Sequence, residues 1–277
     1  MRKLLLALTI LSLVKCGTQN STLDSSASKG PLFEWNFSEQ RKFIYTFEQD
    51  VVNEMGISID SPKDKSKLRG DGLMTVRVKE DSLADLSLLD LKISMQTINE
   101  DGTESEPTTQ NSPPIVVQDM SPAGKFKSAN PNALFEMLIP LPKKDLKEGE
   151  TYELPMQFPF NAGGSSLYIK GHNSLTFSGY KTIRDRKCAV LNGVLDISKL
   201  DIPEELKGQY SGSVTGETTY YFDLENGFYV GADVFMVMDV FIDSTTKEDT
   251  EAGVYGDYLD AKNENTFKIR LKTIEEI

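Results

Sequence analysis

The feature that most constrains the fold is the alternation of apolar and polar residues, which recurs in long runs along the chain. Residues 89–95 have leucine, isoleucine or methionine at every second position and polar residues between them. Residues 43–47 and 74–78, and several runs after residue 165, show the same spacing. Successive side chains of a strand point to opposite faces, so each run predicts an antiparallel strand with one buried and one wet face. The sequence therefore predicts an all-β or β-rich α+β protein.

Three short stretches interrupt this pattern. Residues 130–142 ("NPNALFEMLIPLP") predict one short helix, which an asparagine can cap and Pro140 must end. Pro155 and Pro159 limit the next apolar run to a sheet edge or a loop. Residues 223–227 ("DLENG") lie between apolar runs and predict a tight hairpin turn.

Two parts of the chain have a similar pattern. Residues 70–81 and 215–226 each place a glycine and an acidic residue before an alternating run. We therefore expect two similar antiparallel curved sheets, one in each of two lobes with approximate limits 33–142 and 143–277. Residues 16–32 come before the first lobe, and because they are mostly small and polar they are expected to form a flexible tether.

The N-terminus has the composition of a targeting segment. Residues 1–15 combine a basic start with an apolar run at 4–14, which is shorter than the roughly 20 residues that span a bilayer. Residues 13–16 ("LVKC") resemble the lipobox of bacterial lipoproteins, except that Lys15 occupies a position where a small residue is usual. This resemblance implies a signal peptide cut before Cys16, acyl chains such as palmitate on Cys16, and attachment to the outer membrane.

Two other interpretations of Cys16 remain open. The signal could be cut at a different site, or Cys16 could form a disulfide with Cys188, since the chain has two cysteines and is expected to be exported. If Cys16 is lipidated, Cys188 is the remaining thiol, and the alternating run around it predicts a buried, inert side chain. Arg186 and Lys187 would lower its pKa only if the thiol were exposed.

The mature part of the chain resembles envelope proteins of unknown function from Gram-negative bacteria. The resemblance rests on "KEGETYELP" and on "GETTYYFDLENGFYVGADVFMVMDV", which follows it later in the chain. It implies a two-lobed antiparallel β fold and no known activity, and it transfers no catalytic residue.

No residue pattern indicates an enzyme, a cofactor or a metal site. His172 is the single histidine, and its neighbours Gly171 and Asn173 suggest a turn. The net charge of −12 disfavours nucleic acid as a partner. Residues 58–72 ("SIDSPKDKSKLRGDG") predict a turn-rich connector between two strands. Within it, Arg69, Gly70 and Asp71 spell an adhesion tripeptide, which would act only if it projected from an exposed loop; a hairpin turn is the other interpretation of these residues.

The most informative run is 230–243, which is apolar on both faces of the expected strand. Such a strand belongs in a core, or it covers a core on one side and an apolar groove on the other. Phe235 and Phe241, or Met236 and Met238, would line such a groove, since methionine adapts to irregular ligands.

These observations lead to one main hypothesis and two alternatives. The main hypothesis is a lipid-anchored cell-envelope protein with a non-catalytic binding or structural role, whose partners are the membrane, through its lipid, and an unknown protein or apolar ligand. The first alternative is a carrier or sensor of an apolar ligand in the β groove. The second is a surface adhesin.

Overall fold

The computed structural model describes residues 30–58, 62–127, 133–162, 165–200, 209–243, 245 and 258–277. These residues form eleven β-strands and one short α-helix. In chain order they are β1 (Arg41–Gly56), β2 (Asp64–Val78), β3 (Ala84–Ile98), β4 (Thr108–Asn111), β5 (Ile115–Met120), α1 (Ala133–Leu138), β6 (Thr151–Ala162), β7 (Ser165–Ile183), β8 (Arg186–Leu200), β9 (Tyr210–Asp223), β10 (Phe228–Asp243) and β11 (Tyr258–Glu276). The predicted antiparallel β class with one short helix is confirmed.

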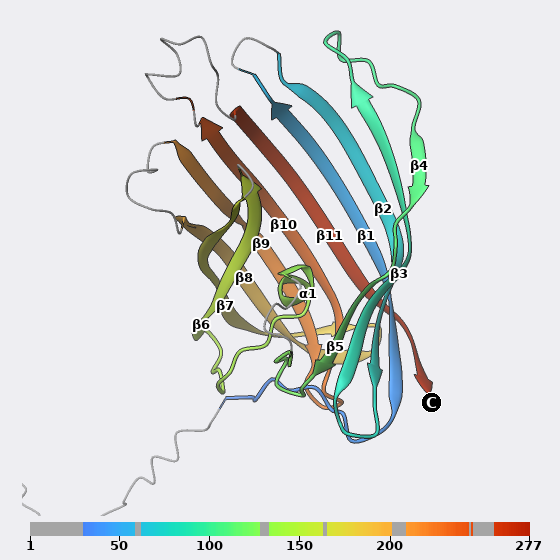
Figure 1. The fold of residues 1–277 in the computed structure, drawn as a ribbon. Helices are drawn as coiled ribbons and strands as arrows, with labels where there is room; N and C mark the ends of the chain where they lie inside the picture. Colours follow the sequence, from blue (N-terminus) through green and yellow to red (C-terminus); the bar gives the residue numbers. More distant parts are fainter. Residues whose placement is uncertain are drawn as a thin grey trace, which may run out of the picture.

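All of these strands belong to one curved antiparallel sheet (Figure 1). Its order is β4-β3-β2-β1-β11-β10-β9-β8-β7-β6, and β5 also pairs with β3. The two sheets expected from the sequence are therefore joined into one, because β1 pairs with β11 from Arg41 to Gly56. This pairing brings together strands from opposite ends of the chain, which a local residue pattern cannot specify.

Two local predictions hold in this sheet. β6 is the last strand at one edge, as expected for a strand that contains Pro155 and Pro159, because proline cannot donate a hydrogen bond to a second neighbour. The turn after β9 is also as predicted: the backbone N–H of Gly227 donates to the carbonyl of Asp223 over 2.8 Å. The positive φ of Gly227, 70°, explains why glycine ends this turn.

The curvature of the sheet brings some neighbouring strands very close together. A Cβ atom at Gly216 in β9 would lie 2.1 Å from the carbonyl oxygen of Phe235 in β10. A Cβ at Gly171 in β7 would lie 2.2 Å from the carbonyl oxygen of Asp196 in β8. Only glycine allows the backbones to approach this closely, so these two positions help to set the shape of the sheet.

Two segments fill part of the concave side of the sheet. The first, which we call the strap (residues 30–37), buries Phe33, Trp35 and Phe37. Backbone hydrogen bonds attach it to two loops: Trp35 N–H donates to the carbonyl of Pro122 over 2.9 Å, and Asn36 N–H donates to the carbonyl of Gly227 over 2.8 Å. The strap therefore supplies aromatic side chains to the core without being a strand.

The second segment is α1 with the residues that follow it, which lie in front of the sheet in Figure 1. The helix buries Phe135, Met137 and Leu138 and ends before Pro140, as predicted. Buried tyrosines of the sheet hold this segment, because the Tyr220 hydroxyl donates to the carbonyl of Met137 over 2.7 Å and the Tyr229 hydroxyl donates to that of Pro140. The half of the concave side that contains α1 is thus closed by packing and hydrogen bonds.

Candidate ligand-binding face

The four residues proposed for an apolar groove lie on opposite faces of β10. Met236 is buried and Met238 is partly buried on the side of the core, whereas the Phe235 side chain is 44% exposed on the outer side. The Phe241 ring also lies on the outer side and packs edge-on against the Tyr258 ring at 5.9 Å. The methionines and the phenylalanines therefore cannot line the same groove, since neighbouring residues of a strand point in opposite directions.

The methionines belong to a larger apolar surface on the core side of the sheet. Register places Leu68 opposite both Val51 and Met95, and it places Asn265 opposite both Val51 and Met236. These rows, together with the neighbouring positions on the same side toward the end of β1 at Gly56, form a surface that we call the open face. Its described residues include Val51, Asn53, Met55, Asp64, Ser66, Leu68, Ile93, Met95, Thr97, Met236, Met238, Ala261, Asn263 and Asn265.

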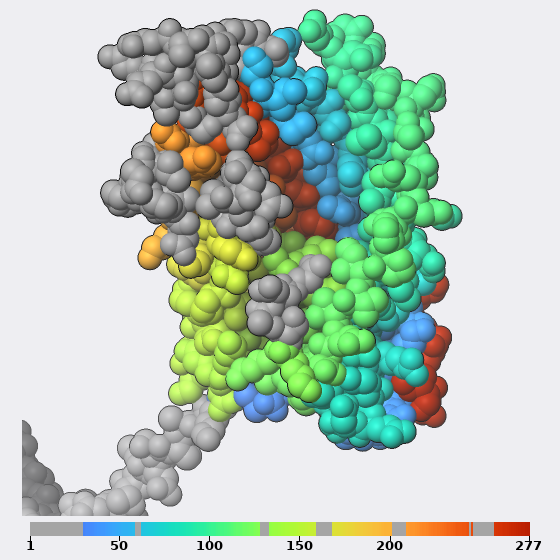
Figure 2. Space-filling view, in the orientation of Figure 1, coloured from blue at the N-terminus to red at the C-terminus, as the bar shows by residue number. Residues whose placement is uncertain are grey.

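The open face is less covered than the rest of the same side of the sheet. The Met95 side chain is 50% exposed and that of Met55 is 44% exposed, although both lie on the core side. In contrast, Tyr45 and Met74, further along β1 and β2 on the same side, are fully buried. Figure 2 shows the same difference: surfaces of β1 and β2 (blue) and of β11 (red) remain visible in a hollow beyond the helix.

Among these residues of the open face only Asp64 is charged, and it lies opposite Met55 at the end of the sheet; the others are apolar, amides or hydroxyls. In the part of β1 and β11 that carries the open face, the charged residues point to the other face of the sheet. There Glu54 pairs with Lys65 over 2.7 Å, and Lys262 pairs with Glu264 over 2.9 Å. Lys65 lowers the pKa of the Glu54 carboxyl, and Glu264 raises the pKa of the Lys262 ammonium. The concave wall is therefore suited to an uncharged, largely apolar ligand.

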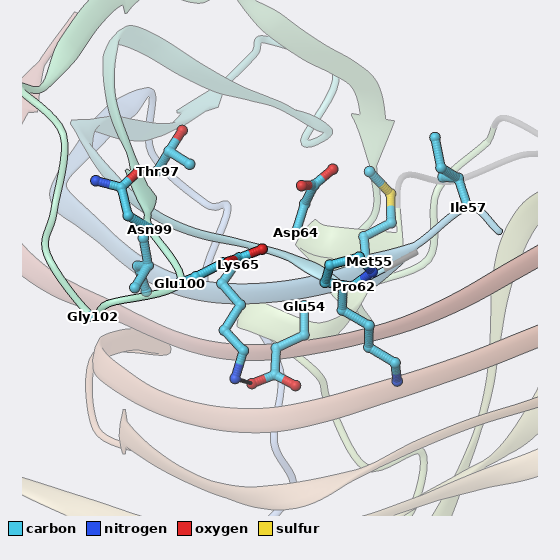
Figure 3. Close-up of a pocket in the computed structure, with 12 residues that line it drawn as sticks. Glu54, Met55, Ile57, Pro62, Asp64, Lys65, Thr97, Asn99, Glu100 and Gly102 are labelled. Carbon is cyan, nitrogen blue, oxygen red and sulfur yellow. Dashed lines mark hydrogen bonds and ion pairs between the residues drawn. The ribbon is translucent and has the colours of Figure 1, made fainter. Parts of the chain in front are cut away.

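A hollow of about 1060 Å³ lies at the end of β1, β2 and β3, beside the open face (Figure 3). Met55 and Thr97 line it from the core side, and the exposed Ile57 side chain adds apolar surface. The ion pair between Lys65 and Glu54 borders it. This end of the sheet therefore offers a polar rim next to an apolar wall.

The adhesion tripeptide does not lie on a turn. Arg69, Gly70 and Asp71 are inside β2, between β1 and β3, and Gly70 is buried. The first half of β2 was expected to be a connector, because Ser66 and Gly70 interrupt the apolar alternation at positions that face the core side. The sequence prediction of a turn at these residues was therefore wrong, and the geometry gives no support to adhesion through them.

The two residues considered for chemistry also lie within strands. His172 is in β7 and not in a turn as expected, and its Nε2 atom is 3.1 Å from Oε2 of Glu153 in β6. Cys188 in β8 is a buried free thiol, and burial raises its pKa to about 11. Because the thiolate is the reactive form, the expectation that Cys188 is buried and inert fits this environment.

Several other predictions fall outside the part of the chain that the structure describes. Cys16, the signal peptide at 1–15 and most of the expected tether lie before residue 30. In the described ranges, no group of three or more histidine, cysteine or carboxylate side chains is placed to hold a metal ion. Within those ranges there is also no helix of the length and apolarity needed to cross a bilayer.

The sequence pattern identified only part of the open face. Met236, Met238 and residues 89–95 were recognised as alternating, but Met55, Leu68 and the asparagines of β11 were not. The asparagines continue the alternation of Phe267 and Ile269 backward along β11. The available signal was a polar residue at a position where the alternation predicts an apolar one. This signal indicates a binding face only when the strand register shows that the residue lies on the core side.

Comparisons with known proteins find similar solved structures but no similar sequence family. No protein-family model matches the chain, and no curated protein is significantly similar to it. The chain resembles a solved structure reported as "lipid-protein interactions in lipovitellin", with 11% identity and a TM-score of 0.46, over 87% of this chain but only 26% of that one. It also resembles a DUF1329 family protein from Desulfovibrio piger, with 10% identity and a TM-score of 0.17, over 86% of each chain. At these TM-scores neither likeness indicates a ligand or an activity.

Proposed function

We propose that the protein is a non-catalytic carrier that holds an apolar ligand against its open face. The observation that carries this proposal is the exposure of Met55 and Met95 on the core side of the sheet, on a face whose described residues are apolar, amides or hydroxyls apart from Asp64 at its end. Large apolar side chains on that side are normally covered, and a covering ligand would gain roughly 25 cal/mol for each Å² of apolar surface removed from water.

The ligand class follows from the shape and chemistry of the face. Four methionines, Met55, Met95, Met236 and Met238, contribute to it, and their flexible thioethers can adapt to alkyl chains of different length and branching. A concave wall with this composition matches the extended hydrocarbon chains of a lipid. An anionic group would lose its hydration there without gaining a cationic partner among the described residues of the face.

This proposal can be tested by comparing lysine substitutions on the open face with lysine substitutions on the outer face of the sheet. The chain with Cys16→Ala is used, so that no attached lipid competes, and binding of N-phenyl-1-naphthylamine is followed by fluorescence. Met55→Lys with Met95→Lys is expected to weaken binding at least about tenfold, a loss of roughly 1.4 kcal/mol, because two ammonium groups would then face the apolar ligand.

The matched control is Val52→Lys with Phe235→Lys. These side chains are 38% and 44% exposed, but they lie on the outer face of β1 and β10. This variant is expected to bind the probe as the parent chain does. Equal loss of binding in both variants, or none in either, would contradict a site on the open face.

We further propose that this carrier is anchored in the bacterial envelope, at the outer membrane, through acyl chains on Cys16. The support is the lipobox-like sequence at 13–16 and the polar, small-residue composition of the segment that follows. Three acyl chains would anchor it firmly, at about 0.8 kcal/mol for each buried CH₂ group.

Intact-mass measurement of membrane-extracted protein tests this second part. The wild-type mass should equal residues 16–277 plus acyl chains, and the Cys16→Ala variant should lose both the modification and the membrane association. Unmodified wild-type protein in the soluble fraction would refute the anchor without affecting the binding proposal.

A further inference from the structure

The open face is not uniformly apolar, because three asparagines cross its middle. Asn53 in β1 lies directly opposite Asn263 in β11, and Asn265 is the next residue of β11 on the same side. On the other flank, Asn53 lies opposite Ser66 in β2, and its Nδ2 atom is 3.4 Å from the Ser66 Oγ. We call these four residues the amide strip.

The amide strip is flanked by apolar side chains on both sides. Leu68 and Met95 lie toward β3, and Met236 and Met238 lie on β10, directly opposite Asn265 and Asn263. Asn265 is only 7% exposed, while Asn53 and Asn263 are partly exposed toward the concave side. Any chain that covers the methionines must therefore also cover amide groups.

Covering these amides with hydrocarbon alone would be unfavourable. A buried polar group that loses its water and gains no hydrogen bond costs about 1–3 kcal/mol. Each asparagine carries two N–H donors and one carbonyl acceptor, so the complementary ligand group needs an acceptor and preferably a donor as well. Among the described residues, the rows of the amide strip contain no charged side chain, and Asp64 in the neighbouring row would repel an anion, so that group is expected to be neutral.

We infer that the amide strip binds the uncharged linkage group of an acyl lipid, namely an ester or amide carbonyl and its neighbouring hydroxyl or N–H. The acyl chain then lies along the methionines, and any charged headgroup lies at the rim near Lys65 and Glu54. This inference rests on the proposed function and specifies the ligand class within the same site.

Three compounds with the same twelve-carbon chain separate these contributions: monolauroylglycerol, laurate and dodecane. Each is used to displace N-phenyl-1-naphthylamine from the full chain carrying Cys16→Ala. Monolauroylglycerol is expected to bind at least about tenfold more tightly than the other two, because two or three net hydrogen bonds of roughly 0.5–1.5 kcal/mol each favour it.

The double variant Asn53→Leu with Asn263→Leu should lose this preference, with monolauroylglycerol binding within about threefold of dodecane once the hydrogen bonds are absent. Binding of the apolar probe itself should be unchanged or tighter, which also shows that the variant is folded. The matched control is Thr46→Leu with Thr266→Leu, which alters the outer face of the same two strands and should keep the preference.

The outcomes distinguish this inference from the proposed function. If the asparagine variant keeps the preference for monolauroylglycerol, or if the parent chain prefers laurate, the amide strip has been assigned wrongly while the apolar site stands. If the parent chain binds neither the probe nor any of the three compounds, both the site and the strip are refuted.

Discussion

Replacing Trp35 with alanine is expected to lower the free energy of unfolding by about 3–5 kcal/mol, the usual cost of removing a buried aromatic side chain. The Trp35 ring is buried in the strap and lies 5.7 Å from the rings of both Phe43 and Tyr229, which belong to β1 and β10. It also packs edge-on against Phe222 of β9 at 6.4 Å. Its removal therefore leaves a cavity where the strap meets three strands of the sheet.

Urea unfolding followed by far-UV circular dichroism measures this effect, since Trp35 is the single tryptophan and its fluorescence is lost with it. Leu32→Ala in the same strap is the control, because Leu32 is 50% exposed and its loss should change stability by less than about 0.5 kcal/mol. Similar stability of the Trp35 variant and the parent chain would contradict the packing role of the strap.

Gly216→Ala is expected to destabilise the protein by about 3 kcal/mol, at the upper end of the usual cost of overpacking. The added methyl group would lie 2.1 Å from the carbonyl oxygen of Phe235 and 2.8 Å from the Cα atom of Met236. Both atoms belong to the backbone of β10, so the methyl group can be accommodated only if the pairing of β9 and β10 opens.

Gly56→Ala is a suitable control for this substitution. Its new Cβ would meet Cγ of the flexible Lys63 side chain at 3.3 Å, and its nearest backbone atom, the carbonyl oxygen of Asp260, is 3.8 Å away. We expect a change below about 1 kcal/mol, since a surface lysine can move aside. If both glycine variants unfold at the same urea concentration, close approach at Gly216 does not control the curvature.

The concave side has two halves with different packing: one is filled by the strap and α1, and the other carries the open face. The strap and α1 bury aromatic and aliphatic side chains in one half. There the hydroxyls of Tyr220 in β9 and Tyr229 in β10 donate to the carbonyls of Met137 in α1 and of Pro140 just after it. In the other half Met55 and Met95 stay exposed, and there we propose that a ligand covers them. Substitutions in the strap should therefore change the free energy of unfolding far more than they change the preference among ligands.

The local pattern predicted those elements whose side chains alternate without interruption. β3 and β10 were recognised for this reason, as were the turn that ends at Gly227 and the helix that Pro140 ends. The first half of β2 was missed because Ser66 and Gly70 interrupt the apolar series. His172 was assigned to a turn because Gly171 stands beside it, whereas Gly171 is needed for the close approach of β7 and β8.

The sequence by itself determined which residues share a face of each strand, because the period of two is a property of the extended backbone. The alternation therefore places Met236 and Phe235 on opposite faces of the strand. It does not show which of these faces is covered by other parts of the chain. Only the tertiary structure decided that β1 pairs with β11, that one half of the concave side is filled, and that the amide strip lies in the other half. These features depend on contacts between residues far apart in the chain, and the free energy of such contacts is not contained in any local pattern.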